Sequence, residues 1–210
     1  MPKFTHTVLC ATLLMASLGA HADEQSRNLP GFKTIKSRSA MTLLVEVGKP
    51  QSVLIKGDEK FISGVITEVV GDELVITTRE KNSIKISDSA QVIITVPELS
   101  RFKMEGAGSS TLNNINGSRL DIAYEGAGML KANGKVKFLY LKAQGVGLVD
   151  TKNLIAEQAD VSLEGVGAVK VYASDRLKAS VQGIGSLHYY GNPRSVSKSV
   201  EGIGSVGAGD

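Results

Sequence analysis

The tetrapeptide Glu105-Gly106-Ala107-Gly108 decides the fold, because its pattern of an acid or amide, a glycine, an aliphatic residue and a glycine returns five times. The later copies follow at intervals of 20, 19, 20, 18 and 19 residues, beginning at Glu125, Gln144, Glu164, Gln182 and Glu201. A fixed period of this length indicates repeated units that stack on one another. The copies contain 12 of the 23 glycines of the chain: Gly106, Gly108, Gly126, Gly128, Gly145, Gly147, Gly165, Gly167, Gly183, Gly185, Gly202 and Gly204.

The residues that flank each tetrapeptide alternate between apolar and polar, as in a strand with one buried face. With the Glu or Gln counted as position 0, apolar residues recur at positions −3 and −1 and again at +5 and +7. The residue between the glycines reads Ala, Ala, Val, Val, Ile, Ile along the chain, and we expect it to point into the core where the chain turns a corner. Glycine suits such a corner because it tolerates unusual dihedral angles and takes up little room.

Two short strands and a turn region in about 19 residues predict one coil of a parallel β-solenoid, an all-β fold whose coils stack ~4.8 Å apart. A Greek-key sandwich is the alternative, but it gives no reason for a fixed spacing. Residues 100–210 form the predicted G-x-G coils. Residues 40–99 have strand-like runs at 52–55, 73–76 and 91–94, which we expect to be further coils with irregular corners. We expect residues 23–39 to be a linker or a lid over the first coil.

Residues 1–22 have the pattern of a secretory signal peptide, with Lys3 before an apolar run over residues 8–18 and small residues at Ala20 and Ala22. The apolar run of about 11 residues is too short to cross a bilayer as a helix. We therefore predict cleavage before Asp23, no transmembrane segment after removal of the signal, and export to the periplasm, the cell surface or the extracellular space.

Composition excludes several classes of function. Cys10 is the one cysteine and lies within the predicted signal peptide, so the exported chain has no disulfide and no thiolate metal site. His188 is its one remaining histidine. We therefore expect no metal, no cofactor and no catalytic residue. The net charge of +3 comes from 24 basic and 21 acidic residues spread along the chain, which argues against a nucleic-acid partner.

A row of acidic side chains is the first candidate binding site. In a stacked solenoid, Glu105, Glu125, Glu164 and Glu201 share one outward column with two glutamines. Adjacent carboxylates at this spacing repel by about 1 kcal/mol in water, and the column is either a solvated ladder or a row that binds a cation or a polyhydroxylated chain. The spacing of Glu105 and Glu125 also suits a retaining glycosidase, but it follows from the solenoid itself.

A second candidate patch combines cationic and aromatic side chains on neighbouring coils. Lys170, Tyr172, His188 and Tyr190 occupy positions +6 and +8, which face outward. Such a surface suits a sugar or an acidic polymer, and ordinary cross-strand pairing explains it equally well.

The recurring E/Q-G-x-G-x-[LV] coils from Glu105 to Val206, together with the segments 52–59 and 72–76, resemble the auto-transporter adhesin head GIN domain family of bacteria. The resemblance covers about 170 residues. It implies an exported right-handed parallel β-helix at the cell envelope or surface with an adhesive role. The family has no established catalytic residues to carry over.

These observations predict a non-enzymatic, exported β-solenoid with an adhesin-like binding or scaffold role. We expect its partner to be a glycan or an envelope surface protein, and we expect the free edge of the C-terminal coil to support a homo-oligomer. The alternative is a polysaccharide-active enzyme, such as a pectinase-like lyase or hydrolase. That alternative rests on fold-level analogy alone.

Overall fold

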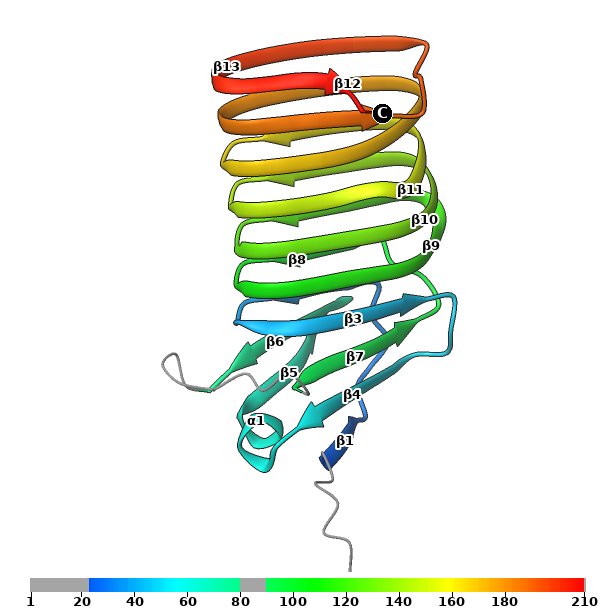
Figure 1. Cartoon of the computed structure of the whole chain (residues 1–210). Helices are drawn as coiled ribbons and strands as arrows, with labels where there is room; N and C mark the ends of the chain where they lie inside the picture. The colour runs from blue at the N-terminus through cyan, green and yellow to red at the C-terminus, as the bar shows by residue number, and fades with distance from the viewer. Residues whose placement is uncertain (1–22, 80–89, 210) are drawn as a thin grey trace, which may run out of the picture.

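The computed structural model describes residues 23–79 and 90–209, and within them thirteen strands and one short helix build a β-solenoid (Figure 1). The predicted signal peptide, residues 1–22, lies outside the described residues. Within residues 23–79 and 90–209, no helix has the length and apolar character needed to cross a membrane. The prediction of a parallel β-solenoid is confirmed.

The regular coils run from β8 to β13, and each pairs in parallel with the next. Equivalent glycines lie in register from coil to coil, since Gly128 pairs with Gly108 on one side and with Gly147 on the other. This register gives most side chains a counterpart in the neighbouring coil, and shifts such as the one between Thr151 and Ile155 interrupt it at the turns. The strands are β8 (Arg101–Met104), β9 (Ala107–Tyr124), β10 (Ala127–Ala143), β11 (Val146–Leu163), β12 (Val166–Tyr190) and β13 (Ser195–Ala208).

Four of the five predicted inward positions fill the core. At positions −3, −1, +5 and +7, side chains such as Ile122, Leu163, Val149 and Val171 are buried. Burial of each of these side chains contributes about 1.5–3 kcal/mol relative to exposure. The hydrophobic contacts therefore run in continuous columns along the solenoid axis.

The fifth inward position was predicted wrongly. The residue between the two glycines points to solvent, with Val146 58%, Val166 47%, Ile184 54% and Ile203 76% exposed. Its N–H donates to the coil beneath, as in Val146 N to Gly126 O at 2.9 Å, so the corner lies flat on the previous corner. The residues that increase in volume from Ala to Ile therefore form a stack of outward side chains and do not line the interior.

The glycines are required by this close stacking. A Cβ on Gly126 would overlap the carbonyl oxygen of Gly106, and one on Gly145 would overlap that of Gly126. Gly128 and Gly147 also have φ of +127° and +144°, in the region that glycine adopts most readily. The expectation about small residues at the corner is confirmed on both grounds.

Residues 23–39 are not a linker or a lid. Asp23–Arg27 forms β1 and Thr34–Ser37 forms β2, whose Ile35 is fully buried. β2 and β3 (Met41–Val47) make a coil that lies directly beneath β8 and β9, with Met41 paired to Gly108. In this coil Ser39 and Met41 stand where later coils have glycine, which is why the motif did not reveal it.

The coils at the N-terminal end do not stack in sequence order. β6 (Glu73–Thr78) and β7 (Gln91–Val96) form one coil that pairs in parallel with β2 and β3 from the other side. Figure 1 shows the green β7 beneath the blue β3. The predicted strands at 73–76 and 91–94 are thus the two sides of one coil, and the coil of residues 34–47 lies between it and the G-x-G coils.

Antiparallel strands close this end of the solenoid. β4 (Ser52–Gly57) pairs antiparallel with β7 and with β1, and β5 (Val65–Val70) pairs antiparallel with β6. The helix α1 (Glu59–Gly64) begins after Asp58, whose carboxylate accepts from Phe61 N at 2.7 Å. The run at 52–55 is therefore a strand, as predicted, but it belongs to this antiparallel cap and not to a coil.

The other end of the solenoid carries an inward charge. Within the described residues β13 pairs with β12 alone, and Lys198 occupies the core position −3. Its Nζ lies 4.7 Å from the Tyr189 ring centroid and 3.5 Å from the carbonyl oxygen of Val206. Inward charges are a common means of preventing edge pairing. The homo-oligomer through this edge stays a prediction.

Candidate functional site

The acidic column faces outward as predicted, but lysines from position −2 lie between its members. Lys103 Nζ lies 2.8 Å from Glu105 Oε1 and 2.9 Å from Glu125 Oε1. Glu105 also contacts Lys36 at 2.9 Å and Arg38 at 3.1 Å. The expected repulsion between the two adjacent glutamates is therefore relieved by a shared lysine.

This network sets the ionisation of Glu105. Partial burial alone would raise its pKa, but hydrogen bonds from Lys103 and Lys36 outweigh that effect and lower the pKa to about 2. The same contacts raise the pKa of Lys103. A carboxylate held in this state keeps its charge near neutral pH and has no proton to give, so Glu105 is a poor general acid for a glycosidase.

Glu164 has a similar network three coils after Glu105. Lys142 Nζ lies 3.2 Å from Oε1, Gln144 donates to Oε2 at 2.7 Å, and Ser162 donates to Oε1 at 3.2 Å. Burial raises the pKa of Glu164, and these hydrogen bonds more than compensate, so the net shift is downward. The last member of the column, Glu201, is exposed on β13.

The side chains of the second predicted patch do not bond to one another in the described part of the chain, and the patch stays a prediction. Among the described residues, no polar contact joins any two of Lys170, Tyr172, His188 and Tyr190. The Tyr172 ring lies against Gly191, where a Cβ would meet its ring carbons, and the Tyr190 ring lies against Gly209 in the same way. Both tyrosines therefore pack on glycines further along the chain, which supports the cross-strand explanation.

A shallow trough lies on the strands that precede the corner, and sequence reasoning missed it. Its volume is about 320 Å³, and it crosses four coils from β10 to β13. Position −2 supplies its small side chains, because Lys142 is followed in register by three serines. We call it the serine trough, and it is lined by Tyr140, Asp160, Ser162, Glu164, Lys178, Ala179, Ser180, Ser197 and Ser199.

The walls of the serine trough are compensated in charge. Lys178 Nζ lies 3.3 Å from Asp160 Oδ2, and Lys142 neutralises Glu164. Tyr140 is 38% exposed at the β10 end and offers an aromatic face. The trough combines hydroxyl groups, paired carboxylates and one aromatic ring, which suits hydrogen bonding to an uncharged polar ligand.

A second depression lies further along the same strand positions. Its volume is about 500 Å³, and Thr34, Arg101, Asp121 and Tyr140 follow one another in register from one depression toward the other. Arg119 Nε donates to Asp121 Oδ1 at 2.7 Å and its guanidinium lies 5.0 Å from the Phe138 ring centroid. One continuous polar face therefore runs along the solenoid.

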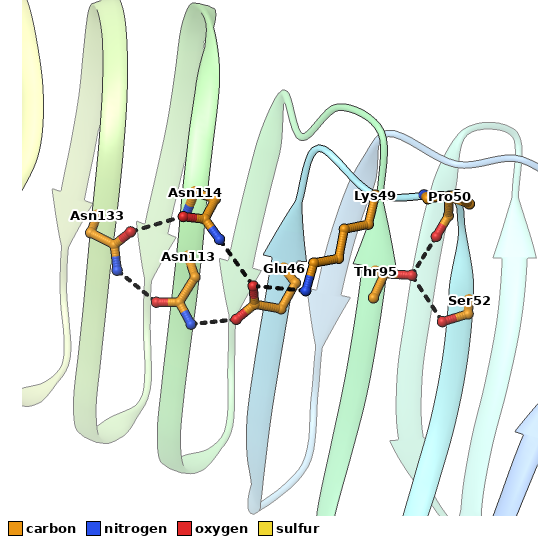
Figure 2. Close-up of polar contacts among 8 residues, drawn as sticks. All are labelled: Glu46, Lys49, Pro50, Ser52, Thr95, Asn113, Asn114 and Asn133. Carbon is orange, nitrogen blue, oxygen red and sulfur yellow. Dashed lines mark hydrogen bonds and ion pairs between the residues drawn. The ribbon is translucent and has the colours of Figure 1, made fainter.

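A polar cluster at the opposite corner, which Figure 2 shows, was not predicted from the sequence. Asn113 Nδ2 donates to Glu46 Oε1 at 2.6 Å, and Asn114 Nδ2 donates to Oε2 at 3.0 Å. Asn133 binds both asparagines, and Lys49 lies 3.5 Å from Glu46. The hydrogen bond from Asn113 is the main cause of the lowered pKa of Glu46. This cluster joins β3 to the regular coils. Because both carboxylate oxygens of Glu46 are already bonded, the cluster leaves little capacity for a ligand.

The described residues contain no group of three or more His, Cys, Asp or Glu placed to hold a metal ion. The carboxylates of the polar face are bonded to lysine, arginine and amide groups instead. The chemistry available on this face is therefore hydrogen bonding and ion pairing.

Comparison with known proteins places the fold among solved structures. A "putative adhesin" from Bacteroides fragilis has a TM-score of 0.73 at 21% identity, with 90% of this chain and 98% of that chain covered. One from Parabacteroides distasonis has a TM-score of 0.52 at 16% identity, with 90% and 97% covered. Another, from Parabacteroides merdae, has a TM-score of 0.50 at 18% identity, with 91% and 97% covered. No curated protein is significantly similar to this chain.

The family model described as "Putative auto-transporter adhesin, head GIN domain" matches residues 31–193. This range holds β2 to β12, and so it includes the coil that lies out of sequence order as well as most G-x-G coils. It covers well over half of the chain. The chain therefore belongs to the auto-transporter adhesin head GIN domain family.

Proposed function

We propose that this protein is an exported, adhesin-like binding protein of the cell envelope that acts without catalysis. Membership of an adhesin family and the likeness to solved adhesin structures support the coarse role. The signal-peptide pattern of residues 1–22 supports export.

The observation that carries the proposal is the shape and charge of the polar face. Its trough extends over four coils and is shallow, and its carboxylates are paired with lysines. A catalytic cleft instead brings an acid and a base of different pKa together at one point. An extended row of satisfied polar groups is suited to holding a chain-like ligand on a rigid scaffold.

Two measurements test this function. Expression of the full chain followed by cell fractionation should recover it outside the cytoplasm, and the labelled protein should bind envelope material. Incubation with a panel of polysaccharides should leave their chain lengths unchanged. Cytoplasmic retention, or depolymerisation that disappears in a Glu105→Gln, Glu125→Gln double variant, would overturn the proposal and favour the polysaccharide-active alternative.

A further inference from the structure

We infer that the serine trough binds a neutral polyhydroxylated chain, that is, a saccharide, laid along the solenoid axis. The inference rests on the proposed binding function and names its ligand class and its site. The floor of the trough is lined by serines. Ser162, Ser180 and Ser199 pair in register on successive coils, so their hydroxyl groups repeat at ~4.8 Å.

The serine hydroxyls are suited to recognise other hydroxyls. Each can donate one hydrogen bond and accept two. Ser162 already donates to Glu164, whereas Ser180 and Ser199 make no side-chain hydrogen bond within the part of the chain that the structure describes. Two successive coils thus present free hydroxyls on an open floor.

Position −2 holds different residues in the earlier coils, so the serine trough is a local feature of the later ones. There it reads Lys36, Lys103, Ala123 and Lys142, and the lysines bind the glutamates of position 0. From Ser162 onward the column is small and uncharged. A ladder selected for ion pairing alone would have kept lysine beside Glu201, which is exposed and has no ion pair among the described residues.

The walls define the charge and shape of the ligand. Asp160, which Lys178 contacts at Oδ2, can accept a hydrogen bond from a ligand hydroxyl, while Lys178 and Lys142 balance the charges of Asp160 and Glu164. A polyanion would meet these carboxylates and the exposed Glu201. Tyr140 supplies an amphipathic ring on which the apolar face of a sugar can pack.

The test uses the purified full-length exported chain and an array of neutral and acidic oligosaccharides. Ser180→Leu fills the floor of the trough, and we expect affinity for the bound neutral saccharide to fall ~10-fold or more. Tyr140→Ala should weaken binding by about threefold to tenfold. Ser186→Leu is the matched control, because Ser186 is a half-buried serine of the same strand outside the trough. It should bind as the unchanged chain does.

A melting curve for each variant separates loss of binding from loss of folding, and Ser199→Leu on β13 replaces Ser180→Leu if the latter unfolds. No binding to any neutral saccharide, or equal affinity in Ser180→Leu and Ser186→Leu, would overturn the inference. Binding of acidic oligosaccharides alone would do the same.

Failure of the inference and failure of the proposed function can be told apart. Binding to envelope material that survives both Ser180→Leu and periodate oxidation of the surface sugars leaves the adhesin-like role intact and removes the saccharide site. Binding to isolated saccharides by a protein that is recovered only in the cytoplasm would support the saccharide site and overturn the exported, adhesin-like role.

Discussion

Side-chain size at each G-x-G corner is controlled by the coil beneath it. Gly145 lies over the carbonyl oxygen of Gly126 and against the Tyr124 ring, so a methyl group has nowhere to go. Tyr124 itself is buried, and its hydroxyl donates to Val146 O at 3.0 Å across the corner. The glycine and the tyrosine together make the contact between these coils.

Gly145→Ala should therefore destabilise the fold by about 3 kcal/mol or more, because overlap with main-chain atoms cannot be relieved by a rotamer change. Gly117→Ala is the control, since a Cβ there has nothing within 4 Å, and its effect should stay within about 0.5 kcal/mol. Urea unfolding of both variants measures the difference. Equal midpoints would show that Gly145 does not stack on the carbonyl oxygen of Gly126.

Glu105 should make stability depend on acid pH. Glutamate in an unfolded chain titrates near pH ~4.3, whereas the folded pKa of Glu105 is about 2. Its lowered pKa stabilises the fold above pH ~4, and this contribution is lost as the pH falls through about 4 toward about 2. Glu105→Gln should therefore be less stable at pH 7 and lose less stability between pH ~4 and ~2. Urea unfolding at several pH values checks this, and parallel curves for the two proteins would refute it.

At the scale of elements, the coil made by β2 and β3 is the one that lies between coils formed by later parts of the chain. It pairs with β6 and β7 on one side and with β8 and β9 on the other. Folding must bring residues 34–47 between segments that come later in the chain. Such non-local pairing loses chain entropy on loop closure before the stabilising contacts form, which slows folding.

Ile35→Ala should consequently cost about 2–5 kcal/mol, because the side chain is fully buried between two neighbouring coils. Val200→Ala offers a contrast on the edge strand β13, where the side chain is 44% exposed, and its cost should be below about 1 kcal/mol. Chemical denaturation followed by far-UV circular dichroism compares them. If Ile35→Ala costs no more than Val200→Ala, the coil does not have the intermediate place assigned to it.

Sequence predicted the elements better than their order. The alternation at positions −3, −1, +5 and +7 identified the buried faces because each is a local pattern with one meaning. Stack order depends on pairing between distant residues, and Thr34–Ser37 is too short and lacks the glycines that mark other coils. The middle residue of G-x-G was misplaced because its direction follows from the Val146 N to Gly126 O type of hydrogen bond, which no single repeat reveals.

The candidate site was predicted only in outline. The acidic column was found because Glu or Gln recurs at position 0. The serine trough exists because lysine is absent from position −2 in the later coils. Ser162, Ser180 and Ser199 look unremarkable until Lys103 and Lys142 are seen to bind glutamates in the same column. The cluster around Glu46 could not be found at all, since only the stack order brings Glu46 of β3 beside Asn113 and Asn114 of β9.

At the scale of the whole molecule, the described residues form one stack of coils, and a polar face runs along it. Antiparallel strands cover the N-terminal end, Lys198 crosses the C-terminal end, and the coils between them contact their neighbours only. A site on such a scaffold is extended by adding coils, so a ligand that is itself a chain with a repeat would suit the proposed site. The serine trough, crossing four coils, offers contacts over a span of ~14 Å.

The most direct test of this account is the affinity of the full chain for neutral oligosaccharides of increasing length, measured by calorimetry. Affinity should rise with each added sugar until the ligand spans the ~14 Å of the trough, and then remain constant. Equal affinity for a single sugar and for a long chain, or no affinity at any length, would contradict the assignment of the serine trough as the binding site.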